Sequence, residues 1–349
     1  MEFINQFLHG EAKAVLSLLP SQTYRCCVTS PPYWGQRDYG TGEWIGGEMN
    51  CKHKFIKVNK KICKCGAVYE DEQIGLEETP EIFIERLADV FDEVKRVLTN
   101  DGTLWLNIGD TYISNNNGHA PPKRSSSPKD YSNTVGSLLP HRHTQGIYKN
   151  KDLVGIPWML AFELRKRGWY LRTEIIWHKP NVLPESVKDR PTRTHEYIFL
   201  LSKSEKYFYD YKAIREPTKY DGRENVYNGS KKYNTDEFRP NNTQHSSIGR
   251  KRKRWTEDKD GNFVRNKRNL WSIPTKPSFD EHHATYPTEL IDTCIKAGSE
   301  TGDLVLDPFV GTGTTAFQSL ILNRRFTGID LNYKNIKISK TKVSDIVYF

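Results

Sequence analysis

A strand that runs into a glycine-rich turn and then a helix, late in the chain, constrains the fold most. Residues 303–315 read Asp-Leu-Val-Leu-Asp-Pro-Phe-Val-Gly-Thr-Gly-Thr-Thr. Glycines at such a turn allow a ligand to lie against the backbone N–H groups at the start of the helix. The pattern is typical of an α/β sheet that binds its ligand at the carboxyl end of a strand.

The rest of the framework also alternates strands and helices. Thr79 can cap a helix that begins at Pro80, and an apolar stripe continues this helix to Leu98. Further helices are expected at residues 11–19, 153–167, 287–297 and 312–323, and strands at residues 25–29, 103–108, 169–177, 195–201, 303–306 and 325–330. This order predicts a doubly wound α/β sheet.

We compared three kinds of ligand that bind at a glycine turn of this type. A P-loop needs Lys where Thr314 stands, which argues against phosphoryl transfer. NAD would accept Gly311-x-Gly313 with Asp330, but the 19 residues after Asp330 leave no room for the rest of such a domain. The third is S-adenosylmethionine, with Asp307 suited to its cationic amino acid group and Asp330 to its ribose hydroxyls. A tight turn without any ligand also fits this motif when it is taken alone.

A second motif, Ser30-Pro31-Pro32-Tyr33, follows the strand expected at residues 25–29. Two prolines fix an extended backbone and remove two N–H donors, which leaves carbonyl oxygens beside a hydroxyl and an aromatic face. This combination suits a flat group that carries an NH₂. Ser30 and the carbonyl of Pro31 can accept its N–H groups while Tyr33 stacks on its ring. Alone, the motif would fit a proline-stiffened strand exit equally well.

Together, the two motifs resemble those of the amino-methyltransferases of DNA, which methylate the exocyclic nitrogen of cytosine or adenine with S-adenosylmethionine. Residues 102–110, 175–180, 190–197 and 325–330 are also similar to segments of that family. The motif order is that of its β group, whose sheet is circularly permuted. The resemblance implies a Rossmann-like S-adenosylmethionine-dependent methyltransferase sheet with basic target-recognition insertions.

The resemblance also implies roles for individual residues. The catalytic residues would be Ser30, Pro31, Pro32 and Tyr33, and Trp177 and His178 would line the other side of a flipped-out base. The cofactor would be bound by Glu11, Ser30, Asp307, Pro308, Phe309, Gly311, Gly313, Thr314 and Asp330. In the family, Ser before Pro-Pro-Tyr usually accompanies cytosine N4, and adenine N6 stays open as the alternative. Methylation of cytosine carbon 5 would need a nucleophilic Cys, usually after Pro, and the sequence contains no Pro-Cys dipeptide.

Two short Cys/His pairs, Cys51-x-His53 and Cys63-x-Cys65, lie in an insertion after the catalytic motif. In a reducing compartment these spacings suit a tetrahedral structural Zn²⁺, with two unrelated pairs of surface residues as the alternative. The other cysteines are expected to pack in the core: Cys26, Cys27 and Cys294.

Positive charge is concentrated in two polar stretches of a chain whose formal net charge is +9. Residues 218–268 contain fourteen Lys and Arg against seven Asp and Glu, and residues 111–150 contain five against one. A basic strip with interleaved aromatic residues suits a phosphate backbone and unstacked bases, so double-stranded DNA is the predicted partner. A solvated loop is the alternative. The candidate DNA-binding residues are Arg250, Lys251, Arg252, Lys253, Arg254, Arg265, Lys267 and Arg268.

These features predict that the chain forms one permuted catalytic domain, which several insertions interrupt. The predicted parts are a catalytic half at residues 1–40, 71–110 and 151–204, a zinc-binding insertion at 41–70, a polar basic loop at 111–150, a target-recognition region at 205–272 and a cofactor-binding half at 273–349.

The sequence therefore predicts a site-specific DNA methyltransferase of a restriction-modification system that acts on cytosine N4. Its rivals are methylation of RNA or of a protein amide, and a zinc-bearing DNA-binding protein without catalysis. No apolar run approaches the ~18 residues that span a bilayer, and the first six residues do not resemble a secretory signal. We expect a cytoplasmic protein, encoded by a prokaryote or a phage. A cognate restriction endonuclease would then be its partner, and monomer and homodimer both remain open.

Overall fold

A computed structural model describes residues 3–54, 62–114, 146–218, 256–258, 260–275 and 286–347. The chain forms two compact units, one of residues 1–210 with 269–349 and the other of residues 211–268. The first unit contains both sequence motifs and both Cys/His pairs.

In the described residues, the first unit is built on an eight-stranded sheet with the order β1-β13-β12-β2-β5-β7-β6-β11. Its strands are β1 (Gln6–His9), β2 (Tyr24–Thr29), β5 (Leu98–Ile108), β6 (Tyr170–His178), β7 (His195–Ser202), β11 (Leu270–Ser272), β12 (Leu304–Asp307) and β13 (Arg325–Asp330). Neighbouring strands are parallel, except that β7 runs antiparallel to β5 and β6. The predicted α/β fold class is confirmed.

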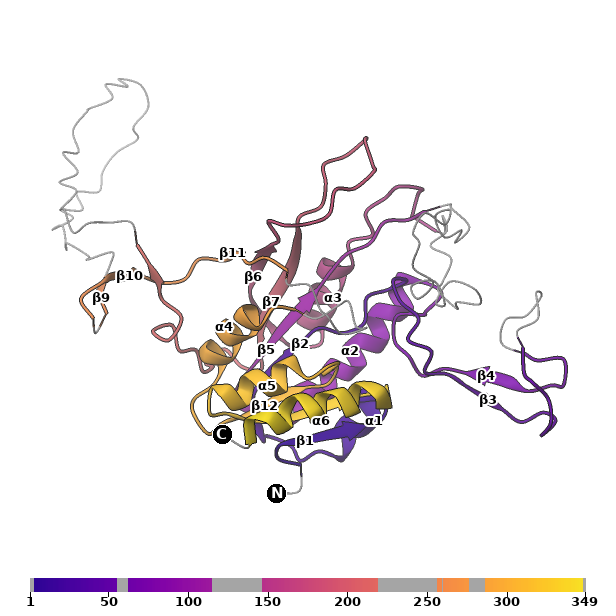
Figure 1. The fold of residues 1–349 in the computed structure, drawn as a ribbon. Coiled ribbons are helices and arrows are strands. Elements are labelled where there is room, and N and C mark those ends of the chain that lie inside the picture. The colour runs from indigo at the N-terminus through magenta and orange to yellow at the C-terminus, as the bar shows by residue number, and fades with distance from the viewer. Residues whose placement is uncertain are drawn as a thin grey trace. The chain divides into compact units, whose positions relative to one another are not determined.

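Two layers of helices cover the sheet (Figure 1). One layer contains α1 (Ala12–Leu18), α2 (Pro80–Val97) and α3 (Ile156–Lys166), and the other contains α4 (Thr288–Gly298), α5 (Thr314–Ile321) and α6 (Tyr333–Val347). Successive side chains of β5 point to opposite faces of the sheet, so they contact different layers of helices. Leu104 and Leu106 of β5 pack with α2, whereas Thr103 and Trp105 approach Gly298 at the end of α4.

Local signals explain most helix boundaries. The Thr79 hydroxyl accepts a hydrogen bond from the N–H of Ile82, which confirms the predicted start of α2. Helix α3 begins three residues later than expected because Gly155 adopts a left-handed φ of 87° before it. Helix α5 begins two residues later than expected for the same reason, since Gly313 has a φ of 81°. The C-terminal helix α6 and the short strand β11 were not predicted.

The sheet brings the two motifs together although they lie far apart in the sequence. β12, which leads into the glycine turn, pairs in parallel with β2, which leads into Ser-Pro-Pro-Tyr, through Val305–Cys26 and Leu306–Cys27. Because parallel strands end at the same edge of a sheet, the glycine turn and the Ser-Pro-Pro-Tyr segment share one edge. Cys26 and Cys27 are fully buried, as predicted.

A separate hairpin leaves this edge between the catalytic motif and α2. Its strands β3 (Glu43–Ile45) and β4 (Val68–Glu70) are antiparallel and only three residues long. The second unit has its own small antiparallel sheet, with the order β8 (Glu216–Pro217), β10 (Phe263–Arg265) and β9 (Thr256–Glu257). Within the described ranges, no helix is both long enough and apolar enough to cross a membrane.

Candidate functional site

A pocket lies at the carboxyl edge of strands β1, β13, β12 and β2, which are neighbours in the sheet. Residues from the glycine turn, the start of α1, the catalytic motif and the base of the hairpin line it together. They include Glu11, Ser30, Pro32, Arg37, Tyr39, Thr41, Glu72, Gln73, Pro308, Phe309, Gly311, Asp330, Asn332 and Asn335.

Asp330 presents a carboxylate in this pocket at the end of β13. One oxygen accepts the N–H of Gly311 at 2.8 Å, and the other accepts the N–H of Asn332 at 2.8 Å and Nδ2 of Asn335 at 3.1 Å. Burial raises the pKa of Asp330 to about 6, although these three donors favour the ionised form. The carboxylate is therefore fixed in place and largely ionised at neutral pH.

Asn335 adds an acceptor to the same pocket. Its side chain belongs to α6 and is 7% exposed, and Oδ1 has no hydrogen-bond partner among the described residues. A buried carbonyl oxygen without a partner costs free energy unless a ligand or water supplies a donor. Asn335 therefore brings a buried carbonyl oxygen without a partner to the wall of the pocket, beside Asp330.

Asp307 lies behind the pocket rather than in its lining. Its carboxylate is 1% exposed and accepts hydrogen bonds from the hydroxyls of Thr29 and Thr315 at 2.6 Å, from the hydroxyl of Tyr286 at 3.0 Å and from the N–H of Phe309 at 3.1 Å. Burial raises its pKa above the ordinary value. Asp307 therefore ties the ends of β2 and β12 to α5, and it positions the turn that does line the pocket.

Glu11 takes part in the pocket and in the local structure. Its carboxylate caps α1 by accepting the N–H groups of Lys13 and Ala14 at 3.0 and 2.7 Å. Gly313 and Thr314 lie outside the lining. Gly313 lets α5 approach α6, since a Cβ there would lie 2.9 Å from Cβ of Ser339.

Ser30 and Tyr33 of the catalytic motif belong to a hydrogen-bond network of polar side chains. The Tyr33 hydroxyl donates to Oε2 of Glu196 at 2.8 Å and accepts from Nδ2 of Asn107 at 2.9 Å. Ser30 Oγ lies at the end of this network, 3.4 Å from Tyr33 Oη and 3.3 Å from Nδ2 of Asn107. These two contacts are longer than an ordinary hydrogen bond, so the Ser30 hydroxyl keeps acceptor capacity for a ligand.

Lys179 and Gly109 complete the support of Tyr33. Lys179 forms an ion pair with Glu196 and lies 4.2 Å from the ring centre of Trp177. A Cβ on Gly109 would lie 2.6 Å from Cε2 of Tyr33, so the ring packs directly on this glycine. Burial, and then the charge of Glu196, raise the pKa of Tyr33 well above its usual value, which keeps the phenol protonated.

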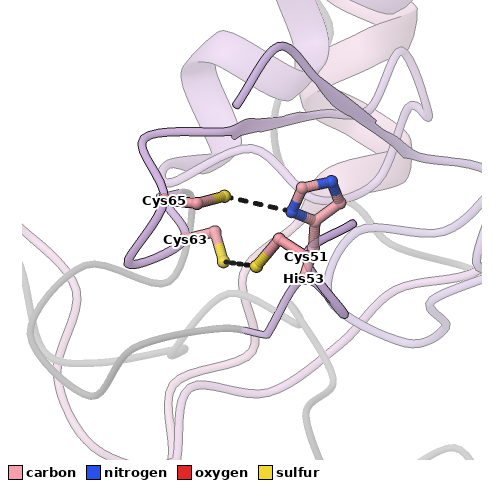
Figure 2. Close-up of side chains that lie close together, drawn as sticks. All are labelled: Cys51, His53, Cys63 and Cys65. Atoms are coloured by element: carbon pink, nitrogen blue, oxygen red, sulfur yellow. Dashed lines mark hydrogen bonds between the residues drawn. The ribbon is translucent and has the colours of Figure 1, made fainter. Parts of the chain in front are cut away.

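The four predicted metal ligands converge in the hairpin (Figure 2). Sγ of Cys51 lies 3.8 Å from Sγ of Cys63, and Sγ of Cys65 lies 3.3 Å from Nδ1 of His53. All four ligand atoms lie within 4.8 Å of one another, and none of the cysteines forms a disulfide. Hydrogen bonds from the backbone N–H groups of Cys65 and Lys54 lower the pKa of Cys63 to about 6.

Comparison with known proteins agrees with this geometry. The family model for DNA methylases of the N6/N4 type matches residues 24–341. The Type II methyltransferase M.Cfr9I of Citrobacter freundii is 41% identical over 338 residues, which cover 96% of this chain and 87% of the relative. The chain belongs to the DNA methylase family. The Type II methyltransferase M.SmaI of Serratia marcescens is 37% identical over 96% of this chain and 89% of its own length.

Two solved structures share the fold of the methylase. The cytosine-N4-specific PvuII DNA methyltransferase has a TM-score of 0.56 and 14% identity, and the match covers 98% of this chain and 91% of that chain. A putative DNA modification methylase from Thermus thermophilus, complexed with S-adenosyl-L-methionine, has a TM-score of 0.53 and 21% identity, covering 98% and 94%.

The predicted DNA-binding residues of the methylase are only partly described. Arg250, Lys251, Arg252, Lys253 and Arg254 lie outside the described residues. In the second unit, Arg265 and Arg268 both form ion pairs with Glu216, with N–O distances of 2.8 Å. These two arginines therefore already share one carboxylate within their own unit.

Several residues of the site were not predicted from the sequence. Asn107, Lys179 and Glu196 surround Tyr33, and Arg37, Tyr39, Thr41, Glu72, Gln73, Asn332 and Asn335 line the pocket. A polar Asn107 inside the apolar run of β5 was a usable signal, because a polar residue in a buried strand needs a partner. Trp177, in contrast, was expected beside the base. It is buried, and its indole N–H donates to the carbonyl of Ile273 at 2.9 Å, so it belongs to the packing around β6.

Proposed function

We propose that the methylase transfers a methyl group from S-adenosylmethionine to the exocyclic N4 of a cytosine that is flipped out of duplex DNA. One observation carries this proposal. Ser30 reaches the cofactor pocket from the Ser-Pro-Pro-Tyr segment, and among the described residues its hydroxyl has only long contacts, to Tyr33 and Asn107. A weakly engaged acceptor beside that pocket is suited to an amino group that must approach the cofactor.

The pocket residues fit S-adenosylmethionine. The Asp330 carboxylate can accept the ribose hydroxyls, and the unpartnered Oδ1 of Asn335 supplies a second acceptor beside it. Glu11, Pro308 and Phe309 complete the surface around the turn. In this proposal Asp307 contributes by holding the turn, because its carboxylate is 1% exposed and its side-chain partners Thr29, Thr315 and Tyr286 do not line the pocket.

The chain activates the amine by accepting hydrogen bonds from its two N–H groups. The lone pair of the cytosine amine is delocalised into the ring, which makes the amine a poor nucleophile. Ser30 Oγ and the carbonyl of Pro31 accept its two N–H groups and favour a tetrahedral nitrogen whose lone pair is free. S-Adenosylmethionine, when bound, supplies the electrophilic methyl group.

Tyr33 positions the base in this proposal. Its hydroxyl is fixed by Glu196 and Asn107, and its ring rests on Gly109, so the orientation of the ring is set before the base arrives. A target base inside a duplex cannot reach the pocket and must be turned out of the stack. A preset aromatic face lowers the cost of holding the base there by stacking.

The basic insertions are proposed to bind the DNA, with residues 205–272 as the main target-recognition region. Replacing Arg250 to Arg254 with alanine removes up to five phosphate contacts. The slope of log K against log salt should then fall in magnitude by up to about 4.5, since each contact contributes about 0.9. An unchanged slope in filter-binding titrations would show that this strip does not bind the backbone.

The proposed function is tested by methyl transfer from labelled S-adenosylmethionine to duplex DNA, RNA and protein in parallel. Wild type should label DNA alone. Ser30→Ala should lose at least about 100-fold in rate while it still binds the cofactor, as expected for loss of one polar contact to the reacting group. Ser17→Ala, on the exposed face of α1, is the matched control and should keep full activity. Full activity in Ser30→Ala would refute the mechanism.

We also propose that Cys51, His53, Cys63 and Cys65 hold one structural zinc ion. Three sulfur atoms and one ring nitrogen form the donor set of structural zinc sites. Elemental analysis of the purified protein should give one zinc per chain, and an absence of zinc would refute this part.

The named Type II relatives further suggest a cognate restriction endonuclease as the partner in the cell.

A further inference from the structure

The Cys/His cluster lies at the outer end of a hairpin that, in its described residues, is otherwise held by a short ladder and by the ring contact of Trp44 with Tyr69. Its strands β3 and β4 share three residue pairs. Among the described residues of segment 42–70, only Cys63 and Ala67 are buried, and Ile45 is 54% exposed. A two-stranded hairpin without an apolar core is marginally stable in water. Another source of stability is therefore needed for a fixed conformation.

The geometry of the cluster fits a single tetrahedral ion. With Zn–S bonds of about 2.3 Å and a Zn–N bond of about 2.1 Å, a tetrahedron places two sulfur ligands about 3.8 Å apart and a sulfur and a nitrogen ligand about 3.6 Å apart. The Cys51–Cys63 separation of 3.8 Å equals the sulfur–sulfur spacing, the Cys65–His53 separation of 3.3 Å is a few tenths of an ångström shorter than the sulfur–nitrogen spacing, and all four atoms lie within 4.8 Å of one another. The sulfur atoms of Cys51 and Cys63 are too far apart for a disulfide, whose bond is about 2.05 Å.

The backbone around the cluster is shaped for these ligands. The N–H of Cys63 bonds the carbonyl of Ala67 at 2.8 Å and forms a tight turn that contains Cys65. A Cβ on Gly47 would lie 2.8 Å from Sγ of Cys65, so the chain passes against the cluster without a side chain. The His53 ring packs on Trp44 of β3, with 5.5 Å between ring centres.

The inner end of the same hairpin forms one wall of the cofactor pocket. Tyr39 and Thr41 line the pocket just before the hairpin, and Glu72 and Gln73 line it just after. The Gln73 side chain, 4% exposed, accepts the N–H of Tyr39 at 2.7 Å and donates to the carbonyl of Arg37 at 2.8 Å.

A second bond joins the two sides of this wall. The Thr41 hydroxyl donates to Oδ1 of Asp71 at 2.7 Å, and the same oxygen accepts the N–H of Gln73 at 2.9 Å. These bonds cross between the two ends of the hairpin. Their geometry therefore depends on the hairpin holding the ends together.

We propose that the metal ion at the Cys/His cluster clasps the hairpin and so sets the affinity of the pocket for S-adenosylmethionine. This inference rests on the proposed cofactor and on the proposed zinc. The ion fixes the outer end, the short ladder of β3 and β4 transmits this constraint, and the bonds around Gln73 and Thr41 keep the wall in its binding conformation. Without the ion, the competent wall is populated only part of the time, and the apparent dissociation constant rises in inverse proportion.

The experiment measures cofactor binding in the absence of DNA, by calorimetry on the full chain with S-adenosylmethionine. Cys51→Ser and Cys65→Ser remove one ligand each, and both residues are only partly buried. Lys52→Ala and Lys64→Ala, exposed residues inside the same Cys/His pairs, are the matched controls. The cysteine variants should lose zinc and bind the cofactor at least tenfold more weakly. Both lysine variants should retain zinc and bind within twofold of wild type.

Two further measurements separate a loosened wall from a protein that has failed to fold. Zinc added back to chelator-treated wild type should restore the affinity. Amide hydrogen exchange should show faster exchange at Tyr39 and Gln73 without zinc, and unchanged exchange in β2.

A folded zinc-free protein that binds the cofactor as tightly as wild type would overturn the inference, as would unchanged exchange at Tyr39 and Gln73. Absence of zinc from wild type would overturn it by removing the clasp itself. If zinc-loaded wild type does not bind S-adenosylmethionine in the calorimetry, the proposed function itself is refuted. This outcome differs from one in which wild type binds the cofactor and the zinc-free protein binds it equally well.

Discussion

Replacement of Tyr33 by Phe tests whether the hydrogen-bond network behind the catalytic motif positions the base. The substitution keeps the ring and removes the hydroxyl that bonds Glu196 at 2.8 Å and Asn107 at 2.9 Å. A hydrogen bond to a charged group contributes about 1.5–3 kcal/mol and a neutral one about 0.5–1.5 kcal/mol. Glu196 retains Lys179 and Asn107, so we expect a loss of about 2 kcal/mol in the free energy of unfolding.

The effect on the reaction should exceed the effect on binding. Without its hydroxyl, the Tyr33 ring can turn about its support on Gly109, and misplacement by about 1 Å can cost 100-fold in rate. We expect kcat for DNA methylation to fall by about 10- to 100-fold, with KM for DNA changed only a few-fold because the stacking face remains. Single-turnover methyl transfer and urea unfolding measure the two effects separately.

Tyr170→Phe is the control, because Tyr170 lies on β6 with 45% of its surface exposed and takes no part in the site. Its kcat should equal that of wild type. Glu196→Gln should lie between wild type and Tyr33→Phe, since Gln still accepts from Tyr33 but no longer neutralises Lys179. A Tyr33→Phe protein that is less stable yet has wild-type kcat would refute the positioning role.

Three further predictions concern the pocket and its support. The pKa of Asp330 is raised to about 6 by burial, and only the ionised form accepts ribose hydroxyls through both oxygens, so the affinity for S-adenosylmethionine should fall as the pH drops below about 6. Asp330→Asn should bind weakly and without this pH dependence in calorimetry from pH 5 to 8. Asn335→Ala should raise the cofactor dissociation constant about three- to tenfold, and an unchanged constant would mean that Oδ1 does not face the cofactor. Gly109→Ala should push the Tyr33 ring by its Cβ and reduce methyl transfer at least tenfold with unchanged cofactor binding; normal transfer would contradict the close contact.

Elements with strong local signals were predicted from the sequence. Helix α2 has its Thr79 cap, its Pro80 start and a regular apolar stripe, and the structure confirms all three. Helix α6 was missed because its buried face carries Ser339 between Ile336 and Val343, so the apolar stripe is broken. That Ser is small because Gly313 packs against it, a requirement set by a different part of the chain.

The site was predictable where one segment carries the chemistry and not where several strands meet. Ser30 and Asp330 follow their own strands and were found from local motifs. Asn107 lies on β5, Glu196 lies on β7 and Lys179 directly follows β6. Asn107 and Glu196 bond Tyr33, and Lys179 bonds Glu196, only because the sheet has the order β2-β5-β7-β6. Strand order depends on long-range packing, which a single sequence does not reveal.

Asp307 illustrates a different limit. An acid at the end of a strand beside a glycine turn suits a cationic ligand, but the same position also suits a buried anchor. The hydroxyls of Thr29, Thr315 and Tyr286 turn its carboxylate into such an anchor. These donors lie on three separate segments, so the motif alone does not distinguish the two roles.

The central claim is tested most directly by identifying the modified base. Duplex DNA incubated with the methylase and S-adenosylmethionine is digested to nucleosides, which are separated and identified by mass spectrometry. The account predicts N4-methylcytosine as the new nucleoside, and its absence with the Ser30→Ala protein. N6-methyladenine or 5-methylcytosine in place of N4-methylcytosine would contradict it.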